Sequence, residues 1–315
     1  MKKIGLIALV CSVLLANLLF VSASAQPALP TIYIRQDGTV DPSTDSIQRD
    51  GDTYTFTGDV FARISVQRAN IVIDGAGYTL RGPYNGTKTD MWIIGQGPNQ
   101  QAQNNETLGI PIIGIDLGGD YVSGITIKNL NIKNFSIGMY VWTVNNTVTG
   151  NNVSENFVGI LLSGTENAIT RNYIGKNDVG IFFGVNQPGE IPINIEVSHN
   201  YFDHNAKHLS GCICKEYNQT EQVHTWDNGE EGNFWSDYNG TDGNDDGIGD
   251  TPYVIDVLNQ DRYPLIQNPV TLPTVALAVP LEVVILVLVI TAIAVTAVIA
   301  LRKRRKTKQT HMESA

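Results

Sequence analysis

The chain lacks the pattern of amphipathic helices over most of its length. Between residues 31 and 270, no apolar stripe recurs with the helical period of 3.6 residues. Cysteine is also scarce: there are three in 315 residues, and Cys11 lies in an N-terminal apolar run, which leaves Cys212 and Cys214. A helical domain and a disulfide-dense scaffold are both excluded, so the central part of the chain is expected to consist of strands.

Basic residues are few outside the two ends of the chain. Between residues 26 and 275, 13 Lys and Arg stand against 29 Asp and Glu, a net charge of −16. Such a surface repels nucleic acid and anionic membranes and attracts cations. A role in binding nucleic acid is therefore excluded.

Both ends of the chain have the features of an exported membrane protein. Residues 1–25 combine two lysines, an apolar run and an Ala-Ser-Ala cleavage motif, which predicts a signal peptide. Residues 283–301 are 19 residues without a charge, which is long enough to cross a bilayer, and a basic tail follows at 302–315. The positive-inside rule makes this tail cytoplasmic, so we predict a single-pass cell-membrane protein with an extracellular ectodomain.

The ectodomain also carries glycosylation motifs. Seven N-x-[ST] sequences permit surface glycans in a eukaryotic or archaeal export pathway. They lie at Asn85, Asn105, Asn134, Asn145, Asn152, Asn218 and Asn239.

One phrase recurs four times between residues 122 and 211 and defines the architecture. Each copy alternates apolar and polar residues, as in Ile125, Ile127 and Ile132, which is typical of a half-buried strand. A period of about 21 residues has room for three short strands and three turns, and stacked repeats bury one continuous core. We predict an all-β fold, a right-handed parallel β-helix with a C-terminal transmembrane helix.

Asparagine marks the register of this repeat. At a stacking distance of about 4.8 Å, residues that recur once per coil lie above one another, and their side-chain amides can bond as a ladder. The spacings within each series are 22, 21 and 28 residues. The predicted ladders are Asn129, Asn151, Asn172 and Asn200, and Asn134, Asn156, Asn177 and Asn205.

These patterns divide the chain into eight segments. They are a signal peptide (1–25), an N-terminal cap with the first coils (26–82), a protruding loop (83–109), the β-helix coils (110–215), an acidic segment (216–270), a linker (271–282), the transmembrane helix (283–301) and the cytoplasmic tail (302–315).

The acidic segment contains a calcium-type loop. Between residues 216 and 261 there are twelve acidic residues and no Lys or Arg. Calcium requires several oxygen ligands, and a D-x-N-x-D-G-x-x-D pattern provides them around a tight turn. The candidate ligands are Asp242, Asn244, Asp246 and Asp250, and a solvated acidic turn is the alternative.

A second group of residues suits a softer metal. Imidazole and thiolate ligands favour copper or zinc, and the candidates are His204, His208, Cys212 and Cys214. In an exported protein two cysteines more often form a disulfide, although a C-x-C disulfide closes a small, strained ring. Both alternatives stay open.

Glycan binding and glycan cleavage are two further hypotheses. Exposed Tyr140, Trp142, Tyr173 or Tyr201 could bind sugars, with packing between coils as the alternative. Cleavage requires paired carboxylates or a base beside a bound uronate, and no close Asp-Asp pair with a nearby His-Gly and Arg occurs in the coils. No catalytic residue is therefore assigned.

The closing segment resembles a known family. Residues 225–265 read TWDNGEEGNFWSDYNGTDGNDDGIGDTPYVID…DRYPL, which is similar to the end of NosD-type β-helix proteins, and IYIRQDGTVDP…NIVIDGAGYTL is similar to membrane-anchored archaeal relatives. NosD proteins are exported and described as periplasmic copper-binding. The resemblance covers residues 31–268 and implies the β-helix fold, but it carries over no catalytic motif.

The sequence thus indicates a cell-surface β-helix protein that binds extracellular glycan or serves a structural role in the envelope. A NosD-like protein that handles copper or another metal is the first alternative. A polysaccharide lyase or hydrolase is the second.

Overall fold

The computed structural model describes residues 29–86, 111–119, 122–184, 192–211 and 223–274. These residues belong to one compact unit that ends at Thr274. In this part of the chain, no helix has the length and apolar character needed to span a membrane. The predicted signal peptide, the predicted transmembrane segment, the tail and most of the predicted loop at 83–109 lie outside the described residues.

The described strands form three large sheets and one two-stranded ribbon, with the following orders. Sheet A consists of β2 (Val40–Asp41), β1 (Thr31–Ile34), β5 (Arg63–Val66), β8 (Ile113–Asp116), β11 (Ile137–Val141), β14 (Val158–Leu162), β17 (Val179–Phe183) and β20 (Lys207–Gly211). Sheet B consists of β18 (Glu196–Ser198), β15 (Ala168–Thr170), β12 (Thr147–Thr149), β9 (Thr126–Lys128), β6 (Val72–Asp74), β4 (Thr53–Phe56) and β3 (Ile47–Asp50). Sheet C consists of β21 (Phe234–Trp235), β19 (Tyr201–Asp203), β16 (Tyr173–Gly175), β13 (Asn152–Ser154), β10 (Asn131–Lys133) and β7 (Thr79–Arg81), and the ribbon pairs β22 (Tyr253–Val254) with β23 (Gln260–Asp261).

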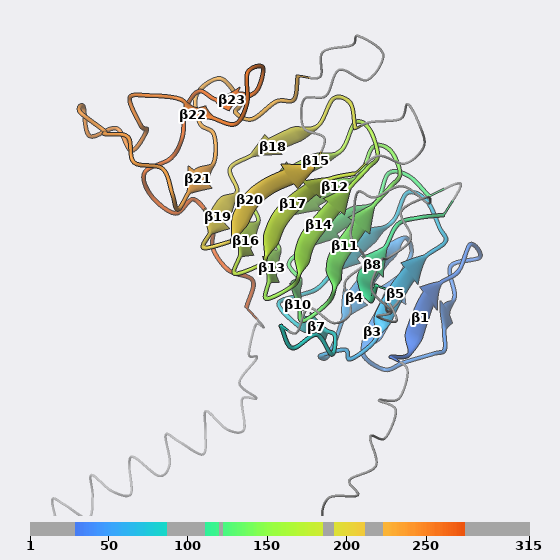
Figure 1. The fold of residues 1–315 in the computed structure, drawn as a ribbon. Coiled ribbons are helices and arrows are strands. Elements are labelled where there is room, and N and C mark those ends of the chain that lie inside the picture. The colour runs from blue at the N-terminus through green and yellow to red at the C-terminus, as the bar shows by residue number, and fades with distance from the viewer. Residues whose placement is uncertain (1–28, 87–110, 120–121, 185–191, 212–222, 275–315) are drawn as a thin grey trace, which may run out of the picture. The chain divides into compact units, whose positions relative to one another are not determined.

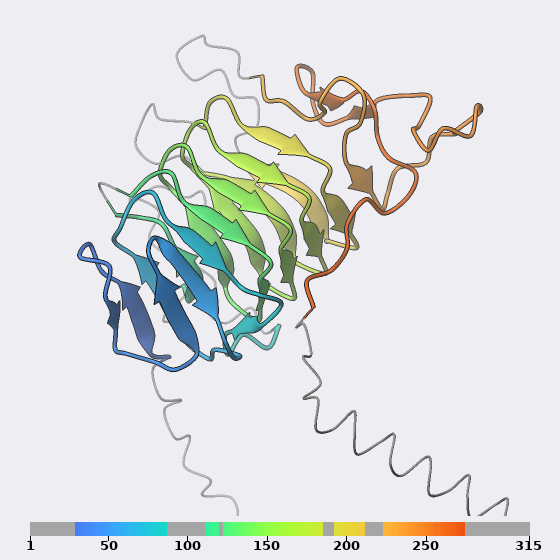
Figure 2. The same ribbon diagram turned by 180° about the vertical axis from the view of Figure 1, so that it is seen from behind.

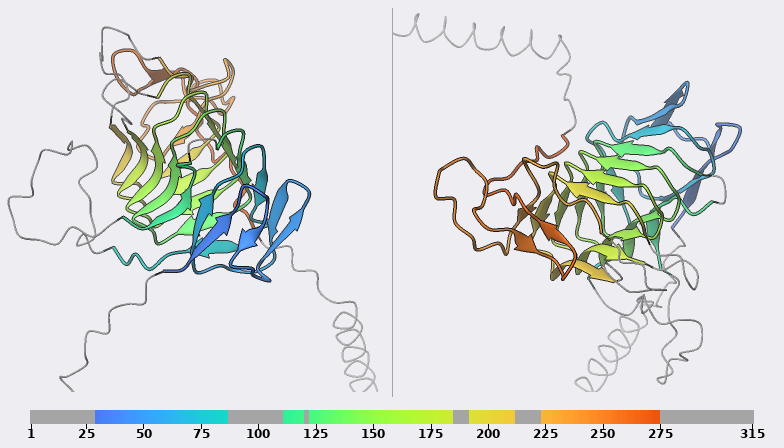
Figure 3. Two further views of the ribbon diagram at one scale, coloured as in Figure 1. Left: turned by 90° about the vertical axis from the view of Figure 1, so that its right-hand side faces the viewer. Right: turned by 90° about the horizontal axis from the view of Figure 1, so that it is seen from above.

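Each coil contributes one strand to each large sheet, and successive coils pair in parallel. Thr147 of β12 lies beside Thr126 of β9 on one side and Ala168 of β15 on the other, so these two steps along sheet B are 21 residues each. Figures 1 and 2 show the coils stacked in chain order from the blue β1 to the yellow β20, and Figure 3 shows the same stack from the side and from above. This all-β arrangement is consistent with the predicted right-handed parallel β-helix.

Antiparallel strands cover the N-terminal end of the stack. β2 runs antiparallel to β1 at the edge of sheet A, and β3 runs antiparallel to β4 at the edge of sheet B. Such strands occupy edges that would otherwise offer unpaired backbone groups to other chains.

Period-two alternation explains the core. In β9 the side chain of Ile127 is fully buried between half-buried Thr126 and Lys128. The residues that pair with Ile127 in the following coils, Val148 and then Ile169, are fully buried as well. Stacking identical positions therefore makes one continuous apolar column along the inside of the coils.

Asparagine side chains line the corners of the coils. The backbone N–H and the side-chain amide of Asn151 both donate to Oδ1 of Asn172 at 3.0 Å, and Asn172 repeats this pattern with Asn200. The second ladder runs through Asn156, Asn177 and Asn205. A shorter third ladder, Asn146 to Asn167, was absent from the sequence prediction.

Two of the predicted ladder residues lie elsewhere. Asn129 and Asn134 are at left-handed corners, with φ of 53° and 61°, one residue before the ladder register. Leu130 opens one ladder and Phe135 opens the other. Their backbone N–H groups donate to Oδ1 of Asn151 at 3.1 Å and of Asn156 at 3.0 Å, respectively. The assignment of Asn129 and Asn134 is corrected accordingly, since a first position only has to donate a backbone N–H.

The first ladder ends on a buried carboxylate. Asn200 donates to Oδ1 of Asn233, and Asn233 donates its backbone N–H to Oδ2 of Asp261 at 2.7 Å. The same carboxylate accepts Nε1 of Trp235 at 2.9 Å and the backbone N–H of Tyr263 at 3.1 Å. Asp261 is fully buried, and this burial raises its pKa to about 6 despite the surrounding donors.

We expect Asn172→Ala to lower the free energy of unfolding by about 3 kcal/mol, because it leaves buried donors of Asn151 without an acceptor. The midpoint of urea denaturation measures the effect. Asn145→Gly is the control: Asn145 is exposed with φ of 58°, which glycine adopts freely, so its midpoint should move little. Equal midpoints for the two variants would show that the ladder does not stabilise the coils.

Asp261 should make the chain less stable as the pH rises. Its folded pKa of about 6 exceeds the unfolded value of 3.8, so the folded state binds the proton more tightly. The contribution is fully present below pH 4 and is lost as the pH passes 6, a change on the order of 3 kcal/mol. Denaturation of the native chain and of Asp261→Asn between pH 4 and pH 7 measures it.

Asp261→Asn should remove the pH dependence that Asp261 contributes, since asparagine does not ionise.

Asp227 provides the opposite case: burial alone would raise its pKa, but bonds from Arg262 and backbone N–H groups lower it. Asp227→Asn should therefore remove a stabilisation that is present above the ordinary aspartate pKa and lost below it. A pH profile of Asp261→Asn that is identical to the native profile contradicts the assignment.

Candidate functional site

A stack of aromatic rings fixes the C-terminal segment to the last coil. The ring of Trp235 lies 4.3 Å from that of Phe202 and 4.3 Å from that of Tyr253, nearly parallel to both. Trp226 is also buried, and its Nε1 donates to Oδ1 of Asn259 at 3.0 Å. This packing places the described part of the acidic segment next to the end of the β-helix.

The calcium-type loop bonds mainly to its own backbone. Oδ2 of Asp242 accepts the N–H of Gly247 at 2.8 Å, and Oδ2 of Asp250 accepts the N–H of Gly243 at 2.9 Å. Asn244 donates its side-chain amide to Asp246 at 2.9 Å. Within the described ranges, no three His, Cys, Asp or Glu side chains are grouped so as to hold a metal ion. Calcium binding by this loop stays a prediction.

The two histidines proposed for copper or zinc differ in their contacts. His208 is buried, its Nε2 lies 3.2 Å from Oδ1 of Asp237, and its Nδ1 lies 3.2 Å from Nδ2 of Asn205. Burial lowers the pKa of His208, so the ring is held neutral. His204 is exposed and its Nδ1 contacts Asp203. Cys212 and Cys214 lie outside the described residues, and the two histidines alone do not form a copper or zinc site.

The aromatic residues proposed for sugar binding divide into two groups. Tyr173 and Tyr201 stack in a row on the outer face of sheet C, with ring centroids 5.5 Å apart. Tyr140 and Trp142 form a tilted pair with centroids 5.4 Å apart on sheet A, and Trp142 is the more exposed of the two. The hydroxyl of Tyr173 donates to Asp203 at 2.6 Å. Burial raises the pKa of Tyr173, and the carboxylate of Asp203 raises it further.

A shallow polar pocket that is open to solvent lies at the N-terminal end of the β-helix. Its lining residues come from the turn between β1 and β2 and from the end of β5: Arg35, Gln36, Asp37, Thr39, Val40, Asp41, Ser43 and Gln67. Gln67 is 32 residues from Arg35 along the chain, and no local motif connects them.

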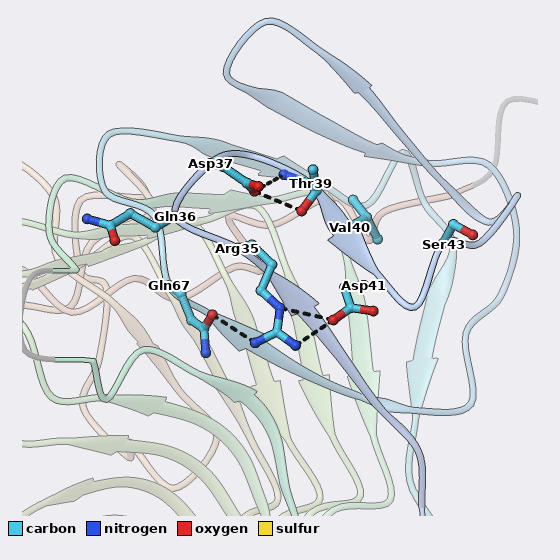
Figure 4. A pocket seen from close by; sticks show the side chains of 8 residues that line it. All are labelled: Arg35, Gln36, Asp37, Thr39, Val40, Asp41, Ser43 and Gln67. Atoms are coloured by element: carbon cyan, nitrogen blue, oxygen red, sulfur yellow. Dashed lines mark hydrogen bonds and ion pairs between the residues drawn. The ribbon is translucent and has the colours of Figure 1, made fainter.

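Arg35 organises this pocket, as Figure 4 shows. Its Nε and Nη2 donate to Oδ2 of Asp41 at 3.1 and 2.5 Å, and its Nη1 donates to Oε1 of Gln67 at 3.2 Å. Cζ of Arg35 lies 4.1 Å from the ring centroid of Tyr33. Bonds from the backbone and hydroxyl of Thr39 lower the pKa of Asp37. The pocket therefore offers fixed polar groups of both signs next to solvent.

Comparison with known proteins gives one match that bears on identity. A family model described as periplasmic copper-binding protein (NosD) matches residues 39–240, which include the described coils and the start of the acidic segment. No curated protein matches the chain. The family match spans more than half of the 315 residues and agrees with the parallel sheets. The predicted resemblance to this family is thereby confirmed over residues 39–240, and the chain belongs to the NosD family.

Proposed function

We propose that this chain is an exported β-helix protein that binds an extracellular glycan without cleaving it. The observation that supports the proposal is the N-terminal pocket, in which the guanidinium of Arg35, the carboxylate of Asp41 and the amide of Gln67 are bonded to one another. A sugar presents hydroxyl groups that both donate and accept hydrogen bonds. Fixed polar groups of this kind bind such a ligand with little loss of side-chain entropy.

The pocket also provides hydroxyl groups and one apolar wall. Thr39 and Ser43 line it together with Val40, which could contact the C–H face of a sugar ring. Asp41 and Gln67 each keep an oxygen or amide group that Arg35 does not use. Direct hydrogen bonds to one or two sugar residues are therefore available without rearrangement of the Arg35 contacts.

Copper handling is a second candidate, because the matching family model is described as copper-binding. Among the described residues, both ring nitrogens of His208 are engaged, and Nδ1 of His204 contacts Asp203, so Nε2 of His204 is the nitrogen that this residue could offer to copper. Copper binding would therefore depend on Cys212 and Cys214. Copper retained by the native chain and lost on changing both cysteines to serine would favour this candidate.

We further propose that the β-helix is displayed at the cell surface. A signal peptide at 1–25 and a membrane anchor at 283–301 would place residues 26–282 outside the cell, with the tail at 302–315 inside. Glycosylation at the N-x-[ST] motifs and a structural role in the envelope are compatible with this location.

The glycan proposal predicts that pocket substitutions weaken binding. The full-length chain should bind one or more hexasaccharides of glucose, mannose or galactose in an immobilised panel. Gln67→Ala should lower the affinity about fivefold to tenfold, because it removes one hydrogen-bonding group from the pocket. Gln48→Ala on β3 is the matched control, since Gln48 is exposed and does not line the pocket.

Two outcomes would overturn the glycan proposal. If no neutral hexasaccharide binds, or if Gln67→Ala and Gln48→Ala bind equally well, the pocket is not the glycan site. Release of shorter sugars during the incubation would replace binding with cleavage and favour the enzyme alternative.

Calcium is expected to stabilise the closing segment. Adding calcium to the chelator-treated chain should raise its melting temperature, because the metal would bind the folded loop and not the unfolded chain. Asp246→Asn should remove most of this shift, whereas Asp45→Asn, on an exposed N-terminal turn, should retain it. An unchanged melting temperature with calcium leaves the loop as a solvated acidic turn.

A further inference from the structure

A second cavity lies near the N-terminal end of sheet C and carries an unusual charge for this protein. It has a volume of about 280 Å³ and is lined by Asp59, Val60, Phe61, Thr79, Arg81 and Lys133. Two of its three charged residues are basic, although the chain between residues 26 and 275 has a net charge of −16. The excess of basic over acidic residues in this cavity is therefore opposite in sign to the net charge of the surrounding chain.

The two basic residues are direct neighbours in the sheet. Arg81 ends β7, Lys133 ends β10, and the two residues pair in register across the parallel strands. In the described part of the chain, neither forms an ion pair with a carboxylate. Like charges at paired positions repel each other, so the arrangement costs stability unless an anion lies between them.

One carboxylate oxygen of the cavity's acidic residue is engaged by the backbone. Oδ1 of Asp59 accepts the N–H of Thr79 at 2.8 Å. The backbone of Val60 makes two hydrogen bonds to β7. Its N–H donates to the C=O of Thr79, and its C=O accepts the N–H of Arg81 at 2.9 Å. These bonds hold residues 59–61 against β7 and involve neither basic side chain of the cavity.

An exposed aromatic ring completes the cavity. Phe61 is 53% exposed, although a side chain of its size is usually buried. Cζ of Arg81 lies 5.8 Å from its ring centroid, close enough for a cation–π contact that orients the guanidinium. The cavity therefore combines paired cations with a flat apolar surface.

We propose that this cavity binds the carboxylate-bearing ring of an acidic saccharide. Arg81 and Lys133 bind the carboxylate, and Phe61 lies against the C–H face of the ring. The inference rests on the proposed glycan-binding function and adds an acidic sugar to the ligand. A nucleic acid does not fit, because it requires a track of many positive charges along the surface.

The test uses the full-length chain and a matched pair of probes. A trisaccharide of glucuronic acid and its methyl ester differ in the charge of the carboxyl groups and in the methyl groups that remove this charge. Calorimetric titration should show that the acid binds at least tenfold more tightly than the ester. The double variant Arg81→Gln and Lys133→Gln should abolish this difference, and the control Lys176→Gln with Lys207→Gln, which removes the same charge from exposed positions, should retain it.

Phe61→Ala separates a sugar site from a simple anion site. It should weaken binding of the glucuronate trisaccharide and leave binding of inorganic sulfate unchanged. Equal affinity for acid and ester, or sulfate binding as tight as trisaccharide binding with no effect of Phe61→Ala, overturns the inference. In that case, neutral hexasaccharides that still bind through Gln67 would leave the proposed function intact.

Discussion

The structure depends on finding an acceptor for the buried backbone N–H group at the corners of each coil. A strand pairs its backbone with the coils on either side, but at a corner the chain turns and regular pairing stops. The buried asparagines solve this problem, because Oδ1 of Asn172 accepts the backbone N–H and the side-chain amide of Asn151 one coil earlier. No coil is complete without the next one, so the coils stabilise one another only as a stack.

Because each corner N–H needs an acceptor from the next coil, the last coil needs an acceptor from outside the repeat. Asn233 is the last asparagine of its ladder, and its backbone N–H still needs an acceptor beyond the last coil. The carboxylate of Asp261 meets this requirement, and it also accepts Nε1 of Trp235. Gly232 leaves the space for it, since a Cβ at this position would lie only 1.8 Å from Oδ1 of Asp261. The end of the ladder and the docking of the closing segment are therefore one interaction.

The repeat predicts the interior of the fold better than its ends, and the ladder shows why. Asn151, Asn172 and Asn200 have to be asparagine because each donates and accepts, so their spacing is visible in the sequence. Leu130 only donates a backbone N–H and Asp261 only accepts, so neither carries the asparagine signal. The two-member ladder of Asn146 and Asn167 is too short to show a period.

The binding candidates escape sequence analysis for a related reason. Inward positions are fixed by stacking, so they repeat, whereas the groups proposed to bind ligands lie where the coils depart from the repeat. Arg35 and Gln67 meet at a hairpin turn beside the end of β5, and Phe61 precedes β5 at an irregular corner near Arg81. Residues that converge from such places share neither spacing nor motif.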